Sequence, residues 1–214
     1  MGRHRAPGQP AVPAEPAPDL RRGQPRGPDR PLVRVPTNGG EKAQWHAKQA
    51  LDLGAYGIVW PHVTSVREAY NAVAACRYPR LPDTPLYEPA GVRGDSPAAA
   101  ARYWGVSAKE YYARSDVWPL DPDGEILVAI MIESRRGVES LPDILDQVPG
   151  IGLVIPGEGD LSQELGVPRQ YDHPRVAESK RRILEVCTER GSPSVIPTSR
   201  RTTSSRCWTT ATGS

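Results

Sequence analysis

Two carboxylates, Glu133 and Asp160, follow two apolar runs, ILVAIMI at 126–132 and GLVIP at 152–156. A pair of carboxylates that meets at one edge of a sheet suits a hard divalent cation. Such an ion prefers oxygen ligands and leaves positions open for water or substrate. The alternative is that each carboxylate caps a helix, since both precede expected helix starts. The spacing alone leaves both readings open.

The two apolar runs are continuous and rich in β-branched residues, which is typical of buried parallel strands. The segment between them, 135–149, is long enough for one crossover helix. The sequence therefore predicts a βαβ unit with a carboxylate at the C-terminal end of each strand. In α/β folds this is the end at which ligands bind.

A glycine-rich turn follows the second run, where Gly157 and Gly159 flank Glu158 and precede a short helix. Glycine lets the backbone approach an anion closely, and a helix N-terminus supplies N–H donors. The turn is therefore a candidate substrate-binding segment together with Glu158 and Asp160. Steric demands of a strand-to-helix turn explain the glycines equally well.

Three further side chains are candidates for a site. Arg34 lies between two valines in an expected buried strand, where it either pairs with a carboxylate or holds an anionic substrate. His62 follows another expected strand and is either a site residue or a hydrogen-bonded loop histidine. Arg93 lies between glycines in the loop 77–96 and either binds an anion or is solvated.

The rest of the pattern alternates strands with helices, as in a parallel sheet or barrel. A long loop such as 77–96 in a compact domain is typically functional or disordered. The expected order is a strand at 32–35, a helix at 41–53, a strand at 56–60, a helix from 65 to about 76, the loop, two short helices with a capping box at 107–110, the βαβ unit, and a helix at 174–189.

Composition excludes several classes of protein. The formal net charge of +2 over 214 residues gives no electrostatic case for nucleic acid. No apolar run reaches the roughly 18 residues of a membrane span, and the basic N-terminus lacks the apolar region of a secretory signal. The three cysteines are odd in number and widely spaced, which indicates a reducing compartment, the cytoplasm.

The two ends of the chain differ from its middle. Residues 1–30 are rich in Pro, Arg, Gly and Ala, and residues 191–214 are biased towards Ser, Thr and Arg without periodicity. Such segments bury too little apolar surface to offset their ordering entropy, so we expect both to be disordered. The expected folded domain is 31–190.

The motifs of this domain occur in an order that resembles the HpcH/HpaI aldolases, the 2-oxo-acid aldolase branch of the citrate lyase β-subunit-like superfamily. The resemblance covers about residues 31–190. It is carried by LVRVP at 32–36, GIVWPHV at 57–63, ACRYP at 75–79, GVRG at 91–94, IMIES at 130–134, GEGDLS at 157–162 and DHP at 172–174.

The resemblance implies a (β/α)₈ barrel that binds Mg²⁺ or Mn²⁺ through Glu133 and Asp160. It implies a class II aldolase that cleaves a 4-hydroxy-2-oxo acid into pyruvate, or a related 2-oxo acid, and an aldehyde. Arg34 would hold the carbonyl oxygen and stabilise the enolate, and the turn 157–159 would donate N–H bonds to the pyruvate carboxylate. A homo-oligomer is also expected. The alternatives are a citrate-lyase-like acyl-CoA lyase, for which no evident basic CoA-binding cluster follows the metal residues, and a catalytically dead fragment that binds metal and oxo acid.

The chain departs from the family at two positions near the expected site. Met131 stands where many relatives have Gln, and Gly-Glu-Gly-Asp stands where many have Gly-Pro-Ala-Asp. Glu158 is thus an extra acid beside the expected metal. These departures bear on the identity of the substrate more than on the metal.

The ends depart further. Relatives have two strands before LVRVP, the second ending in a Glu-His motif linked to base chemistry, and two strands after the last helix here. We therefore expect an incomplete barrel whose ends are read out of frame. Shifted codons permit an Ile-Glu-His run at 2–7, Gly-His-Pro-His-Val at 194–199 and a family-like run at 208–213. The nucleotide sequence of the gene tests this hypothesis, because stops or unrelated sequence in the shifted frames would exclude it.

Overall fold

A computed structural model describes residues 30–36 and 44–193. The chain divides into two compact units, residues 1–30 and 31–214, and all the helices and strands of the described residues belong to the second. The terminal segments that we expect to be disordered or out of frame lie outside the described residues, apart from Arg30 and residues 191–193.

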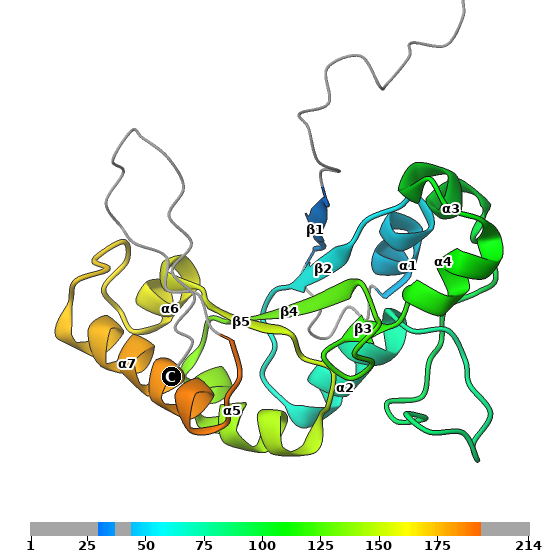
Figure 1. The fold of residues 1–214 in the computed structure, drawn as a ribbon. Helices are drawn as coiled ribbons and strands as arrows, with labels where there is room; N and C mark the ends of the chain where they lie inside the picture. The colour runs from blue at the N-terminus through cyan, green and yellow to red at the C-terminus, as the bar shows by residue number, and fades with distance from the viewer. Residues whose placement is uncertain (1–29, 37–43, 194–214) are drawn as a thin grey trace, which may run out of the picture. The chain divides into compact units, whose positions relative to one another are not determined.

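A parallel sheet of five strands forms the centre of this unit (Figure 1). β4 is its central strand, because β2 pairs with one edge of β4 and both β3 and β5 pair with the other. β3 lies beside the start of β4 and β5 beside its end. The strands are β1 Leu32–Arg34, β2 Gly57–Trp60, β3 Val117–Trp118, β4 Ile126–Ile132 and β5 Leu153–Pro156.

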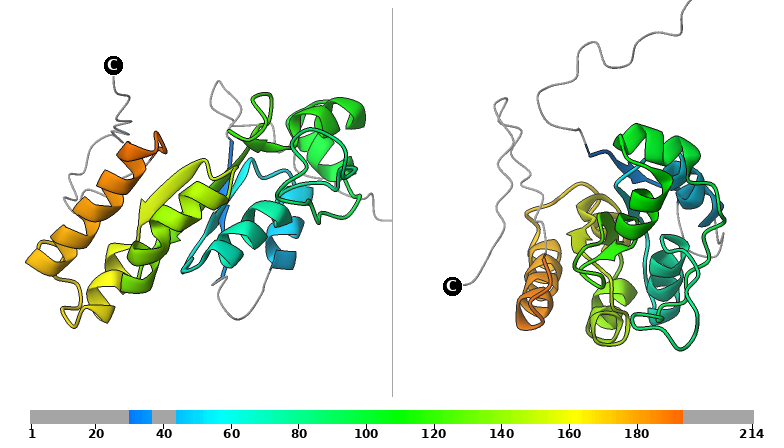
Figure 2. Two further views of the ribbon diagram at one scale, coloured as in Figure 1. Left: turned by 90° about the horizontal axis from the view of Figure 1, so that it is seen from below. Right: turned by 45° about the vertical axis from the view of Figure 1, so that its right-hand side comes forward.

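Helices join the strands, and most of them cover one face of the sheet. The row α1, α2, α5 and α7 is continuous, since each of these helices contacts the next. Figure 2 shows this row from below. The helices are α1 Gln44–Asp52, α2 Val66–Ala75, α3 Ala98–Trp104, α4 Ala108–Arg114, α5 Arg135–Gln147, α6 Glu158–Glu164 and α7 Pro174–Glu189.

The main core lies between β4 and this row of helices. Successive side chains of a strand point to opposite faces, so β4 presents alternate residues to each side. Ile126, Val128, Ile130 and Ile132 are fully buried in the main core, whereas Met131, on the other face, is only partly buried. The side chain of Met131 thus lies on the opposite face of the sheet from this row of helices.

The predicted order of elements is confirmed, including the capping box in which Ser107 and Glu110 bond reciprocally. One strand was not predicted: β3 raises the number of strands from the expected four to five. Its two residues are too few to show any periodicity. The chain is an α/β protein with a parallel sheet, as predicted.

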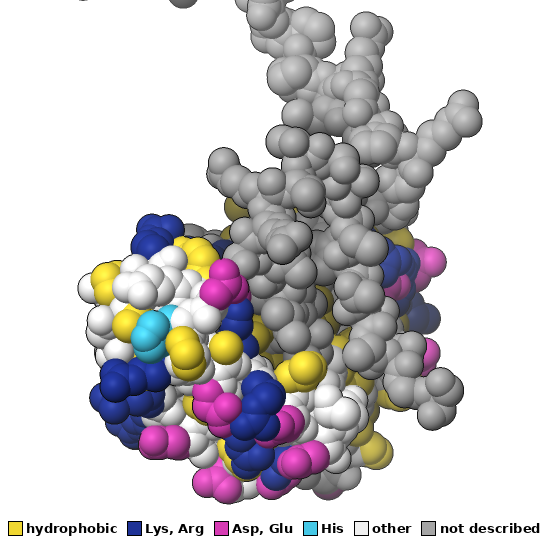
Figure 3. Space-filling model, turned by 90° about the vertical axis from the view of Figure 1, so that its left-hand side faces the viewer, with side chains coloured by type: hydrophobic (Ala, Val, Ile, Leu, Met, Phe, Trp, Pro, Cys, Tyr) yellow, Lys and Arg dark blue, Asp and Glu magenta, His cyan; other side chains and the backbone are white. Residues whose placement is uncertain are grey.

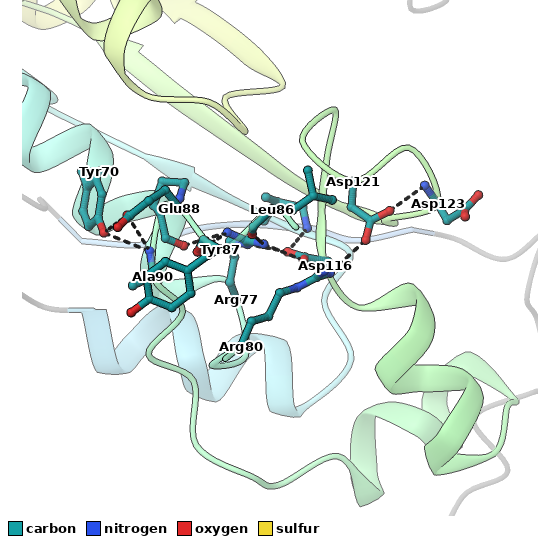
Figure 4. A network of polar contacts seen from close by, with 12 residues as sticks. Tyr70, Arg77, Arg80, Leu86, Tyr87, Glu88, Ala90, Asp116, Asp121 and Asp123 are labelled. Carbon is teal, nitrogen blue, oxygen red and sulfur yellow. Dashed lines mark hydrogen bonds and ion pairs between the residues drawn. The ribbon is translucent and has the colours of Figure 1, made fainter. Parts of the chain in front are cut away.

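The long loop after α2 has no helix or strand, yet a buried arginine holds it in place (Figure 4). Arg77 donates hydrogen bonds to both carboxylate oxygens of Asp116, at 2.6 and 2.8 Å. It also donates to three carbonyl oxygens of the loop, those of Leu86, Tyr87 and Pro89, at 2.6, 3.3 and 2.7 Å. The loop is therefore part of the scaffold.

The chain turns back towards the sheet after α7. Gly191 adopts a left-handed backbone conformation with φ of 62°. The N–H of Val154 then donates to the carbonyl of Pro193 at 3.0 Å. The chain thus begins to run beside β5, where the next strand of a barrel would lie.

The outer face of α7 carries interspersed acidic and basic side chains. Figure 3 shows this mixture on the side of the molecule that holds α6 and α7. Arg181 pairs with Glu178 and Glu185 one turn away on either side, and such exposed pairs add little stability. None of the helices in the described part of the chain has the length and apolar character of a membrane-spanning segment.

Candidate active site

The C-terminal ends of β1, β4 and β5 meet at a pocket of about 350 Å³. This volume lies within the range of small-molecule sites. The parallel arrangement explains the position, because it brings all strand ends to the same edge of the sheet. The lining residues are Arg34, Met131, Glu133, Ile155, Pro156, Gly157, Glu158, Gly159, Asp160 and Tyr171.

Glu133 follows β4 directly and is the most buried acid of this group, with 3% of its surface exposed. Its Oε2 atom accepts a hydrogen bond from the backbone N–H of His62 at 3.1 Å. Burial raises the pKa of Glu133, while the charges of His62 and Arg34 and that hydrogen bond act in the opposite direction. A buried carboxylate of this kind is stabilised by a cation placed beside it.

Asp160 lies in the first turn of α6 and faces Glu133 across His62. The Nε2 atom of His62 is 3.2 Å from Oδ2 of Asp160 and 3.2 Å from Oε2 of Glu133. One ligand atom from each of the three residues lies within 4.8 Å of the others. Two carboxylates and an imidazole, one of the carboxylates desolvated, are a donor set that fits a divalent cation.

Gly157 is required where it stands, because Glu133 occupies the space of a side chain. A Cβ atom built on Gly157 would lie 2.3 Å from Cγ and 2.4 Å from Oε1 of Glu133. The N–H of Gly157 is already donated to the carbonyl of Ile132 at 2.9 Å. That N–H is therefore already engaged within the sheet, and the role of Gly157 as an N–H donor to substrate stays a prediction.

The amides next to it remain candidates. The first hydrogen bond of α6 runs from the N–H of Leu161 to the carbonyl of Gly157. The N–H groups of Glu158, Gly159 and Asp160 thus precede the helical ladder and have no partner within α6. They lie at the wall of the pocket formed by these same residues.

Glu158, predicted as an extra acid near the metal, lines the pocket but is engaged elsewhere. Its Oε1 atom lies 2.6 Å from Nζ of Lys180 on α7, and only 8% of the residue is exposed. Lys180 balances the charge of this acid. No sequence pattern indicates the pair, because Lys180 belongs to a helix that is charged along most of its length.

Arg34 lines the pocket, but it is not buried as expected. β1 is exposed at Leu32 and Arg34 and half-buried between them. In the described part of the sheet β1 pairs only with β2, so it is an edge strand with few neighbours. The charge of Arg34 nevertheless acts on the site, where it partly offsets the rise in the pKa of Glu133 that burial causes.

His62 is more than a loop histidine, because the structure brings it to both carboxylates. Its φ of 54° is unusual for a residue with a side chain. Both its backbone N–H and its imidazole thereby reach Glu133.

Arg93 lies outside the pocket, and the prediction of a solvated or anion-binding side chain is wrong. Only 2% of Arg93 is exposed. It donates to Asp52 at 3.0 Å and to the hydroxyl of Tyr111 at 2.9 Å, and its guanidinium carbon lies 4.2 Å from the centre of the Tyr78 ring. Arg93 therefore joins α1 to α4 inside the protein.

Together, a parallel sheet and a pocket of carboxylates and an arginine at its strand ends are typical of α/β enzymes, including those of barrel type. Comparison with known proteins makes this specific. Residues 24–202 match the HpcH/HpaI aldolase/citrate lyase family, and the chain belongs to that family.

Individual relatives agree with the assignment. The 5-keto-4-deoxy-D-glucarate aldolase of Shigella boydii is 32% identical over 166 residues, 78% of this chain. A HpcH/HpaI aldolase/citrate lyase family protein from Burkholderia cenocepacia has a TM-score of 0.61 at 27% identity, over 78% of this chain and 58% of that one. The citrate synthase SbnG has a TM-score of 0.57 at 29% identity, over 80% and 58%. The chain spans 56% of the length of the Shigella relative.

Proposed function

We propose that the protein is a class II aldolase that cleaves a 4-hydroxy-2-oxo acid into pyruvate, or a related 2-oxo acid, and an aldehyde. The observation that carries the proposal is the meeting of Glu133, Asp160 and Arg34 at one pocket at the strand ends. Membership of the family supports the same class of reaction.

Glu133 and Asp160 would hold the divalent cation, Mg²⁺ or Mn²⁺. The fit rests on the chemistry of the donors, since Glu133 is a buried carboxylate whose pKa burial raises. When bound, such an ion stabilises as a Lewis acid the negative charge that develops on the oxygen of the enolate.

Arg34 would bind the carbonyl oxygen of the oxo acid. Arg34 lines the pocket with Glu133 and Asp160, and a cation at this place opposes the charge that cleavage creates. The amides of Glu158, Gly159 and Asp160 would receive the substrate carboxylate, because they are donors without a partner in the helix.

The substrate is a small oxo acid, in agreement with the name of the Shigella relative, which specifies a keto sugar acid. A pocket of about 350 Å³ is adequate for such a molecule. Met131 and Ile155 give part of its wall an apolar character.

The cell compartment and the assembly are part of the same proposal. Cys76 and Cys187 are buried and are not joined to each other by a disulfide, which fits a reducing compartment, so we place the protein in the cytoplasm. A homo-oligomer of the family type stays a prediction.

The test is release of pyruvate from a 4-hydroxy-2-oxo acid, followed by a coupled reduction, with Mg²⁺, with Mn²⁺ and with a chelator. Wild-type protein is expected to release pyruvate only with metal, and Glu133→Gln and Asp160→Asn are expected to abolish the release. Glu139→Gln on the exposed side of α5 is the matched control and should behave as wild type. Metal binding without any release of pyruvate would contradict the aldolase proposal and favour a protein that only binds oxo acids.

A further inference from the structure

His62 lies between the two carboxylates of the proposed metal site. Its Nε2 atom is 3.2 Å from Glu133 Oε2 and 3.2 Å from Asp160 Oδ2. Neither the pocket at the strand ends nor the proposed reaction gives this imidazole a role. We propose that His62 is a third protein ligand of the cation and that it makes the site prefer a transition metal to Mg²⁺. This inference rests on the metal site of the proposed function.

The distances between donor atoms suit one coordination sphere. Donor atoms bound about 2.1 Å from one ion at right angles lie about 3 Å apart. The two distances from His62 Nε2 have this size, and all three donor atoms lie within 4.8 Å of one another. His62 Nε2 is therefore placed as a neighbour of each carboxylate oxygen in one coordination sphere.

The backbone of His62 also positions the carboxylate of Glu133, the neighbouring ligand. The N–H of His62 donates to Glu133 Oε2 at 3.1 Å, and ligating carboxylates are commonly oriented by such hydrogen bonds. The left-handed φ of 54° allows one residue to supply both this N–H and the imidazole. A strained backbone is retained where the surroundings hold it, and here it positions His62 beside both carboxylates.

The type of donor decides the preference for a metal. Carboxylates and water suit Mg²⁺, whereas an imidazole nitrogen favours Zn²⁺, Co²⁺, Ni²⁺ and similar ions. A set of two carboxylates and one imidazole therefore favours a transition metal over Mg²⁺ more strongly than the two carboxylates alone.

A second arrangement would give the same distances without a metal bond. A protonated imidazole can pair with both carboxylates and take the place of the cation. In that case His62 competes with the metal, and its removal strengthens binding. The two arrangements thus predict opposite effects of one substitution.

The experiment uses the full chain, freed of metal by a chelator and titrated with Co²⁺ and with Mg²⁺. Co²⁺ binding is read from the visible absorption of the ion, and Mg²⁺ binding from calorimetry. His62→Ala is expected to weaken Co²⁺ binding at least about tenfold, the loss that follows even from removing an outer-shell partner of a ligand. Mg²⁺ affinity is expected to change much less, and the Co²⁺ spectrum is expected to shift.

His173→Asn is the matched control, because His173 caps α7 and asparagine also serves as an N-cap. Thermal unfolding confirms that each variant is folded. Unchanged or stronger Co²⁺ binding in His62→Ala would overturn the inference. If Glu133→Gln then still abolishes binding, the proposed metal site stands. Absence of Co²⁺ and Mg²⁺ binding in the wild type would overturn the metal site and this inference together.

Discussion

Gly157 and Glu133 occupy the same space: a Cβ atom on Gly157 would lie 2.3 Å from Cγ of Glu133. The substitution Gly157→Ala must therefore displace the carboxylate or the turn. We expect Mn²⁺ binding to weaken at least about tenfold and the free energy of unfolding to fall by about 1–3 kcal/mol, as for overpacked sites. Calorimetry and urea unfolding measure the two effects.

Gly159→Ala is the control for that change. A Cβ atom on Gly159 meets nothing within 4 Å, and its backbone is not left-handed. Gly159→Ala is expected to bind Mn²⁺ as the wild type does. Equal binding by Gly157→Ala would show that the contact between Gly157 and Glu133 does not position the ligand.

Arg34→Met is expected to weaken the binding of pyruvate to the Mn²⁺-loaded protein by about 10-fold or more, because a charged hydrogen-bond partner of the substrate is lost. Stability should stay within about 0.5 kcal/mol, since the Arg34 side chain is exposed. Arg67→Met, on the exposed side of α2, is the control. Loss of stability without loss of pyruvate binding would assign Arg34 a purely structural role.

The carboxyl group of Asp116 makes the free energy of unfolding depend on pH. Burial raises the pKa of Asp116, but the hydrogen bonds from Arg77 and the Val117 N–H and the charges of Arg77 and Arg80 outweigh it, so the pKa lies below its usual value. A carboxyl whose folded pKa is lowered contributes stability above its unfolded pKa of about 3.9 and loses it as the pH falls through the folded pKa.

Asp116→Asn leaves the buried Arg77 without its partner and is expected to cost about 3–5 kcal/mol near neutral pH. The difference from wild type should shrink as the pH falls below about 4, because the carboxyl of the unfolded wild type is then protonated while the folded one stays ionised to lower pH. Urea unfolding across this range measures it. Asp146→Asn removes an exposed pair with Arg190 and should change little. A difference that stays constant down to about pH 2 would refute this assignment.

Cys76 is expected to be inert in the folded protein. Burial raises the pKa of its thiol to about 12, although the charge of Arg93 acts in the opposite direction. The reactive thiolate is therefore scarce at about pH 8, and the sulfur is inaccessible. Iodoacetamide labelling read by peptide mass spectrometry should modify Cys76 only in denaturant. Rapid labelling of Cys76 in the native protein would mean that this part of the core opens readily.

The strands and helices that carry the site were predictable because their signals are local. The continuous apolar runs identify β4 and β5. Pro174 marks the start of α7, because proline is favoured at the first position of a helix. The strand ends then fix which side chains can meet, and the structure places Glu133, Asp160 and Arg34 at one pocket.

Burial and pairing were less predictable, because they depend on neighbours distant in sequence. Arg34 reads as buried between valines but is exposed on a strand that, among the described residues, pairs only with β2. Arg93 reads as a loop residue but packs on Tyr78. The approach of His62 to Glu133 needs a left-handed backbone that no pattern announces. Lys180 pairs with Glu158, which lies 22 residues away in the sequence, and no sequence pattern indicates this contact either.

The proposed chemistry depends on a divalent cation held by Glu133 and Asp160 at the strand ends. Titration of the metal-free chain with Mn²⁺, followed by electron paramagnetic resonance of the free ion, tests it most directly. We predict about one tight Mn²⁺ per chain and a loss of affinity of at least about tenfold in Glu133→Gln and in Asp160→Asn. Mn²⁺ binding that is the same in both variants as in the wild type would contradict the proposed site.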